Sequence, residues 1–264
     1  MQNNAIGIFD SGIGGLTVAH ALKEKLPKES ILYFGDTKHL PYGEKSDEAI
    51  QNFSLNISKF LLEKKCKAIV IACNSSSSVA FQKVKELSGN IPVFNVIDPV
   101  INKISENNKK CKIGVIGTKA TIQSGIYKRK ILEKSPRYSV TSLATPLLAP
   151  MIEEGFINEE ISKTIIHNYL SSSKLKGIEK LILACTHYPL IQNEIKLFYN
   201  NNIDVIDSVN IVSQSIYEEL KNLKLLNNIS NPKYRFYVSN FTKSFENSAR
   251  FFFQENLKLE EVNI

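Results

Sequence analysis

Two cysteines follow two similar aliphatic stretches, and their setting suits chemistry by a thiol. Cys73 ends the segment AIVIAC, and Cys185 ends the segment LILAC. Each is followed by a small polar residue, Asn74 or Thr186, that can cap a helix. An aliphatic run without polar alternation is typical of a buried parallel strand. We therefore expect each cysteine where a parallel strand ends and a helix begins.

Such positions favour acid–base chemistry on an anionic substrate. Ligands of open α/β sheets bind at the carboxyl ends of the strands. A helix N-terminus offers free N–H groups and a partial positive charge, which attract carboxylates and lower the pKa of a thiol. One cysteine in such a place is more often a buried apolar residue. Because the arrangement occurs twice, we interpret Cys73 and Cys185 as two matched thiols that face one substrate.

The two remaining cysteines indicate packing and not chemistry. Cys66 and Cys111 lie among lysines just before predicted strands, where we expect packing or surface roles. No CxxC or HxxxH spacing occurs in the chain, so the sequence predicts no metal site.

Length and composition narrow the class of protein. A chain of 264 residues with 43% hydrophobic residues is expected to form one large or two ordinary domains. The net charge of +7 comes from lysines spread along the chain, without a basic tract that interleaves with aromatic residues. We therefore expect a small-molecule substrate and no nucleic acid. Residues 1–5 lead straight into a predicted strand and no apolar run approaches the length of a membrane span, so we expect no secretory signal, no membrane partner and a cytoplasmic location with free thiols.

Strand and helix signals alternate along the chain, which predicts parallel sheets with right-handed crossovers. Beside the two cysteine strands, strands are predicted at 6–9, 31–34, 93–96, 112–116, 138–143 and 234–238. Helices are predicted to begin near 16 and 46 and to cover about 75–87, 121–133, 158–170 and 209–223. The segment 145–156 contains two prolines and a glycine and is predicted to be mostly loop. The aromatic-rich stretch 241–253 is expected to complete the packing of the first sheet.

Three landmarks recur in the same order, which indicates two copies of one α/β unit. Their partners are separated by 107, 112 and 109 residues: Ser11 and Thr118, Cys73 and Cys185, Asp98 and Asp207. We predict two similar doubly wound α/β domains with parallel sheets and an active site in the cleft between them. The first domain is expected to comprise residues 1–98 plus 208–264, and the second residues 99–207.

Four separated motifs together resemble the glutamate racemases over the whole length of the chain. They are Asp10-Ser11-Gly12-Ile13-Gly14-Gly15, Pro41-Tyr42-Gly43, Ala72-Cys73-Asn74 and Cys185-Thr186-His187-Tyr188-Pro189-Leu190. The resemblance implies an enzyme that needs no cofactor, interconverts L- and D-glutamate, supplies D-glutamate for peptidoglycan and forms a homodimer. One departure is visible, because Ser75 and Ser76 stand where the family usually has threonine and alanine. A serine hydroxyl can make the same hydrogen bond, so Ser75 is expected to keep the role.

The resemblance also implies a role for each site residue. Cys73 would act on D-glutamate and Cys185 on L-glutamate, one as a thiolate while the other is a thiol. Asp10 and His187 would assist proton transfer or hold the substrate ammonium, and Glu153 is a further candidate beside His187. The substrate carboxylates would be bound by the following residues: Ser11, Pro41, Tyr42, Gly43, Asn74, Ser75, Thr118 and Thr186.

Three alternatives stay open from the residues alone. A dinucleotide-dependent oxidoreductase is suggested by Gly12 and Gly14 after a strand and by Asp36 after the next one, but Thr17 stands where the third glycine or alanine belongs. A racemase of the same family that acts on aspartate or a hydantoin is a second alternative. A non-catalytic binding protein with the same fold is the third, and the presence of both cysteines argues against it.

Overall fold

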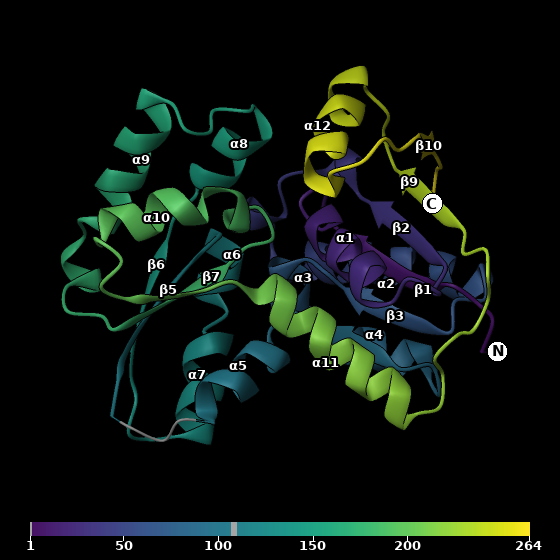
Figure 1. Cartoon of the computed structure of the whole chain (residues 1–264), viewed down its shortest axis with the longest axis horizontal. Coiled ribbons are helices and arrows are strands. Elements are labelled where there is room, and N and C mark those ends of the chain that lie inside the picture. Colours follow the sequence, from purple (N-terminus) through teal and green to yellow (C-terminus); the bar gives the residue numbers. More distant parts are fainter. Residues whose placement is uncertain (1, 107–109) are drawn as a thin grey trace.

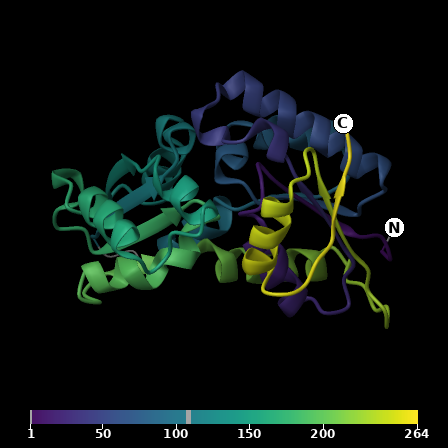
Figure 2. The same cartoon turned by 90° about the horizontal axis from the view of Figure 1, so that it is seen from above.

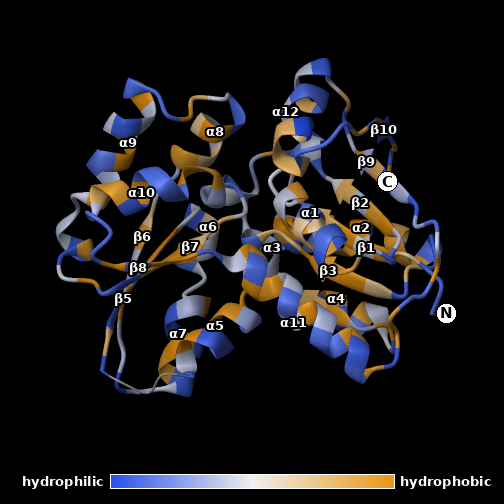
Figure 3. Cartoon of the chain, in the orientation of Figure 1, coloured by the Kyte–Doolittle hydropathy of each residue, from blue (hydrophilic) through white to orange (hydrophobic). Residues whose placement is uncertain are grey.

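Two parallel β-sheets form the frame of the chain in a computed structural model, which describes residues 2–106 and 110–264 (Figure 1). Every strand pair in both sheets is parallel. The two sheets lie beside each other, each with helices on both faces (Figures 1 and 2). The hydropathy colouring shows strongly hydrophobic strands inside both halves and hydrophilic outer helix faces (Figure 3). The strands therefore read as continuous apolar runs because helices cover both of their faces.

The first sheet has six strands. Their order is β10 (Leu259–Glu261), β9 (Tyr234–Val238), β2 (Ile31–Gly35), β1 (Ile6–Asp10), β3 (Ala68–Ile71) and β4 (Val93–Asn95). On one face, Phe9 and Phe34 pack against α2 (Asp47–Glu63) and α4 (Phe81–Ser88). On the other face, Ile8 and Tyr33 belong to the core beneath α1 (Leu16–Lys25), α11 (Ser208–Asn222) and α12 (Lys243–Phe253). Neighbouring residues of a strand thus enter opposite cores, as the alternation of side chains requires.

The second sheet has four strands. Their order is β6 (Ser139–Ala144), β5 (Lys112–Gly117), β7 (Lys180–Ala184) and β8 (Asp204–Ile206). One face packs against α5 (Asp98–Ser105) and α7 (Ile126–Lys134) through Ile113, Val115 and Ile182. The other face contributes Leu181 and Leu183 to the large core. Its remaining helical segments are α6 (Lys119–Gln123), α8 (Leu148–Glu153), α9 (Glu160–Leu170), η3 (Ser173–Leu175), η4 (Tyr188–Ile191) and α10 (Gln192–Phe198).

The two sheets repeat one strand order, which confirms the predicted pair of similar α/β units. The order β2-β1-β3-β4 in the first sheet corresponds to β6-β5-β7-β8 in the second. The chain passes between the halves twice, once before α5 and again where α11 follows β8 (Figure 1). Cys73 after β3 and Cys185 after β7 therefore occupy equivalent positions, each beside the strand with which its unit begins.

Several local predictions were wrong. The segment 145–156 contains α8, because Pro150 lies in the first turn of this helix, where its missing N–H is not needed. The predicted helices over 75–87 and 121–133 are each two helices, divided near Ala80 and at Gly125, which has a φ of 64°. The aromatic-rich stretch forms α12 and packs on the first sheet as expected, whereas β10 was not predicted.

The predicted helix caps after the two cysteines were also wrong. Cys73 itself caps α3 (Asn74–Val79), because its sulfur accepts the backbone N–H of Ser76. Thr186 caps no helix, since the residue before η4 is His187 and no side chain caps that segment. Within the described ranges, no helix combines the length and apolarity that a bilayer span requires.

Candidate active site

The strand ends of both halves meet at one small cavity of about 40 Å³. Twelve of the thirteen predicted site residues line it: Ser11, Pro41, Tyr42, Gly43, Cys73, Asn74 and Ser75 from the first half, and Thr118, Glu153, Cys185, Thr186 and His187 from the second. Both cysteines are 5% exposed, so both face the same enclosed space from opposite units. Leu40, Ala149 and Pro150 complete the lining and were not predicted.

Asp10 is the one predicted residue that lies behind the lining. Its Oδ2 accepts the backbone N–H groups of Gly12 and Gly15, each at 3.1 Å. Complete burial raises the pKa of this carboxyl, while the charge of His187 and the two backbone bonds oppose the rise. Its Oδ1 has no hydrogen-bond partner among the described residues. Asp10 therefore shapes the glycine-rich turn and contributes a negative charge beneath the cavity.

Cys73 lies in surroundings that favour the neutral thiol. Its sulfur accepts the N–H of Ser76 at 3.5 Å and lies 3.8 Å from the hydroxyl oxygen of Ser11. Burial and, to a smaller extent, the charge of Asp10 raise the pKa of Cys73 to about 12 against the opposing effect of these hydrogen bonds. The contacts at the start of α3 lower the pKa of this thiol, as expected of a helix N-terminus, but burial outweighs them.

Cys185 has a partner of the opposite kind. Its sulfur lies 3.6 Å from His187 Nδ1, and His187 Nε2 lies 2.8 Å from a carboxylate oxygen of Glu153 in α8. Burial alone would lower the pKa of His187, but the hydrogen bonds to Cys185 and Glu153 and their charges outweigh it and raise the pKa well above the ordinary value. An imidazolium held between a carboxylate and a sulfur stabilises the thiolate form of that sulfur.

The glycine-rich turn serves the close approach of the two halves. A Cβ on Gly14 would lie 2.3 Å from His187 Cε1, so no side chain fits at this position. The hydroxyl of Thr17, next in the turn, donates to the carbonyl oxygens of Gly14 at 2.9 Å and Thr186 at 3.2 Å. The first turn of α1 is thus packed against the loop that carries Cys185.

Asp36, which would bind the ribose in the alternative of a dinucleotide-dependent enzyme, already has hydrogen-bond partners within the chain. Its carboxylate accepts the hydroxyls of Tyr42 at 2.5 Å and Ser239 at 2.6 Å, and it lies 2.9 Å from His39 Nδ1. With 3% of its surface exposed, it is committed to holding the turn that carries Tyr42. A ribose hydroxyl would have to displace these partners.

Hydroxyl groups join the two halves across the cavity. Ser75 Oγ lies 2.9 Å from Thr118 Oγ1 and 3.3 Å from Thr121 Oγ1. A Cβ on Gly43 would lie 2.7 Å from Thr118 Cβ, so the turn of the first half rests directly on this threonine. At the rim, Lys119 and Glu44 form an exposed ion pair of 2.9 Å. Thr121 was not predicted as a site residue, and its one signal in the sequence is a hydroxyl in the first turn after β5.

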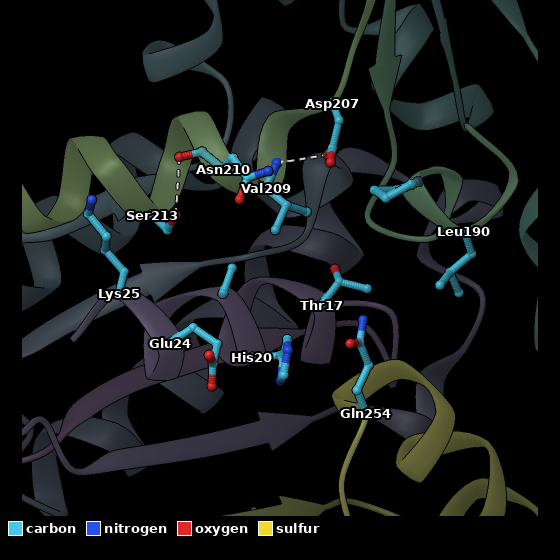
Figure 4. Close-up of a pocket in the computed structure, with 12 residues that line it drawn as sticks. Thr17, His20, Glu24, Lys25, Leu190, Asp207, Val209, Asn210, Ser213 and Gln254 are labelled. Atoms are coloured by element: carbon cyan, nitrogen blue, oxygen red, sulfur yellow. Dashed lines mark hydrogen bonds between the residues drawn. The ribbon is translucent and has the colours of Figure 1, made fainter. Parts of the chain in front are cut away.

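A larger cavity of about 480 Å³ lies between α1, α11 and η4 and carries no thiol (Figure 4). His20, Glu24 and Gln254 project into it, and Thr17 lies between this cavity and the Thr186 loop (Figure 4). Size alone therefore does not mark the place where the two cysteines meet. Among residues 2–106 and 110–264, no three histidine, cysteine or acidic side chains are grouped so that they could hold a metal ion.

Comparison with known proteins gives one consistent family. Residues 16–216 match the family model described as Asp/Glu/hydantoin racemase. A glutamate racemase of Neisseria meningitidis serogroup C is 41% identical over 262 residues, which cover 99% of this chain and 97% of the relative. The crystal structure of a glutamate racemase from Francisella tularensis in complex with D-glutamate has a TM-score of 0.94 and 41% identity, and covers 100% of this chain and 98% of that one. A glutamate racemase from Bacillus anthracis has a TM-score of 0.95 and 34% identity, and covers 100% and 99%.

Proposed function

The chain belongs to the glutamate racemases of the Asp/Glu/hydantoin racemase family, and we propose that it interconverts L- and D-glutamate with Cys73 and Cys185 as its two acid–base groups. One observation carries this proposal: the two thiols line one enclosed cavity from equivalent strand ends in opposite halves of the molecule. Inversion at Cα needs a proton removed from one face and another delivered to the opposite face. Two groups on opposite walls can do both without rotation of the substrate.

The proposed reaction transfers one proton at each face. With L-glutamate bound, the thiolate of Cys185 takes the Cα proton, and the electron pair of the broken C–H bond stays on the substrate as a carbanion-like state. The thiol of Cys73 then gives its proton to the opposite face, which yields D-glutamate and leaves Cys73 as a thiolate. The reverse reaction begins from that state. Release of product and a proton exchange with solvent restore the starting pair.

The surroundings of the thiols support this division of states. The pKa of Cys73, raised by burial to about 12, favours the thiol that donates. His187, with its raised pKa and its contact to Glu153, places a positively charged group 3.6 Å from the sulfur of Cys185. We therefore infer that the resting enzyme is poised to receive L-glutamate.

Hydroxyl and backbone donors are proposed to hold the two carboxylates and the developing negative charge. Ser11, Asn74, Ser75 and Thr118 line the cavity, as does the turn of Pro41, Tyr42 and Gly43. Donors that are fixed before the reaction stabilise charge in an enclosed site better than mobile water does. Thr186 completes the set on the second half. This assignment requires no cofactor.

Substrate entry is proposed to require separation of the halves. A cavity of about 40 Å³ holds only a few water molecules, whereas glutamate has ten heavy atoms. The contacts that must open include the ion pair of Lys119 with Glu44 and the hydroxyl contact of Ser75 with Thr118. We place the boundaries of the moving units at 98/99 and 207/208, so that the first comprises residues 1–98 plus 208–264 and the second residues 99–207.

The wider setting follows from the family as a proposal. We propose a cytoplasmic enzyme that supplies D-glutamate for peptidoglycan and works as a homodimer. Exposed apolar side chains offer surface for such a contact: Leu147, Phe156, Ile161 and Leu197 in the second half, and Phe241 and Phe251 at α12. Light scattering coupled to size exclusion measures the mass in solution, and a monomer at micromolar concentration contradicts the dimer.

Incubation with either enantiomer of glutamate in deuterated water tests the function. We expect the optical activity to be lost without added cofactor, which circular dichroism measures. We also expect deuterium at Cα, which mass spectrometry detects. The variants Cys73→Ser and Cys185→Ser are each expected to abolish full turnover. Racemisation of aspartate in place of glutamate would show that the chain is a racemase of the same family with another substrate. Full activity of either serine variant would refute the two-thiol assignment.

A further inference from the structure

Tyr127 links the two halves directly behind the cavity wall. It is the second residue of α7 in the second half, and its hydroxyl donates to Asn74 Oδ1 at 2.7 Å in the first half. The two side chains are 3% and 2% exposed. A hydrogen bond this well buried and this short fixes the orientation of the groups that make it.

The bond leaves one amide donor of Asn74 unused. Asn74 Nδ2 is buried and has no hydrogen-bond partner among the described residues. Buried donors without acceptors are unfavourable and uncommon in folded proteins. Because Asn74 lines the cavity beside Cys73 and across from Cys185, a bound carboxylate can supply the missing acceptor.

Tyr127 keeps the amide in this orientation as long as its hydroxyl is protonated. Burial raises the pKa of Tyr127 above its ordinary value, and the charges of Cys185 and Asp98 raise it further. The phenol therefore stays protonated throughout the working pH range, and its hydroxyl donates to the carbonyl oxygen of the amide and leaves the amide nitrogen for another partner. Without this neighbour the amide of Asn74 can turn over and present its oxygen to the substrate, where a carboxylate would be repelled.

We propose that Tyr127 is a positioning residue that holds Asn74 across the domain boundary so that Nδ2 donates to a carboxylate of the bound substrate. The inference deepens the proposed function and rests on it for the identity of the substrate. Since α7 and α3 belong to opposite halves, the bond forms only when the halves are together. Closure of the enzyme thus completes the carboxylate-binding donor set on the wall that carries Cys73.

The test is a double-mutant cycle on ligand binding. The dissociation constant of D-glutamate is measured by titration calorimetry for Tyr127→Phe, Asn74→Ala and both together, in a Cys185→Ser background that stops racemisation. Loss of the positioning bond is expected to weaken binding about five- to tenfold in Tyr127→Phe. In the Asn74→Ala background the same change is expected to have less than about a twofold effect, because the group through which Tyr127 acts is gone.

A matched control is Tyr138→Phe, whose hydroxyl donates to the carbonyl of Ile104 at 2.9 Å within the second half. It is expected to leave the dissociation constant unchanged, and thermal unfolding of every variant shows that the fold is kept. With the cysteines intact, Tyr127→Phe is expected to raise KM by the same factor with little change in kcat. Unaltered binding in Tyr127→Phe, or an equal loss with and without Asn74, overturns the proposal while racemisation by the wild type stands. If the double-mutant cycle gives the expected dissociation constants but the wild type does not racemise glutamate, the proposed function is overturned instead.

Discussion

Alkylation of the resting enzyme should distinguish the two catalytic thiols by their ionisation. Both cysteines are 5% exposed and line one cavity, so a small reagent reaches either residue through the same space. A thiol of pKa about 12 has roughly one thiolate in 10⁵ molecules at neutral pH, against about 3% for an ordinary cysteine. The population of reactive Cys73 is therefore smaller by about 10³. A more basic thiolate is intrinsically more nucleophilic by about 40-fold over this pKa difference, which leaves a net retardation of about 10².

The assay is labelling with iodoacetamide near neutral pH, without substrate, followed by mass spectrometry of the cysteine peptides. We expect Cys185, whose sulfur lies 3.6 Å from His187 Nδ1, to be modified first, and Cys73 on the order of 10²-fold more slowly than an ordinary cysteine. Glu153→Gln should slow the labelling of Cys185, because loss of the carboxylate lowers the pKa of His187 and with it the thiolate population. The exposed neighbour Glu154, changed to glutamine, is the control and should have no effect. Equal or faster labelling of Cys73 would refute the assignment of a resting thiol to it.

Three further perturbations test the close contacts, the charge of His187 and the frame. Gly14→Ala should displace His187, which its Cβ would approach to 2.3 Å, and should lower kcat about 10²-fold together with the melting temperature; a normal kcat would show that the contact does not place the imidazole. The pKa of His187 is raised in the folded state, so its charged form stabilises the protein fully below about pH 6.5. This stabilisation is lost as the pH rises through the folded-state pKa. The difference in melting temperature between wild type and His187→Asn should therefore narrow at alkaline pH. A difference that widens with pH would contradict that sign. Lys67→Met should lower the free energy of unfolding, measured in urea, by about 3–5 kcal/mol, because it leaves Glu29 buried without its ion pair of 2.6 Å. The control is Lys180→Met at a surface ion pair, which should lower the free energy of unfolding by less than about 1 kcal/mol. Equal losses would show that burial does not decide the effect.

Local patterns predicted the frame and the strand-end cysteines because those features depend on short segments. Aliphatic runs gave the buried strands, and the order of the landmarks gave the repeated unit. The helix α8 was missed because Pro150 was interpreted as a helix breaker, although a proline in the first turn loses no intrahelical bond. Proline is informative about a helix only once its position within that helix is known.

Contacts between residues far apart in the sequence could not be predicted from sequence patterns. Tyr127 and Asn74 are separated by 53 residues, and nothing in the stretch around Tyr127 indicates that its hydroxyl crosses to the other half. The engagement of Asp36 by Ser239 spans 203 residues and depends on the return of the C-terminal segment to the first sheet. The pKa of Cys73 could not be predicted for a related reason, since burial in the folded chain outweighs the local effect of the helix that begins at it.

The repeated unit explains how two equivalent thiols acquire opposite roles. The strand order places Cys73 and Cys185 at matching positions, so symmetry alone would give the two thiols the same pKa and the same resting protonation state. The two copies differ at the neighbouring residues: the first carries Asp10 at the end of its first strand, and the second carries His187 two residues after its cysteine. A negative neighbour favours the thiol at Cys73, and a positive neighbour favours the thiolate at Cys185. Exchange of these charges between the halves should therefore reverse which enantiomer the resting enzyme is poised to deprotonate, while the positions of both sulfurs stay the same.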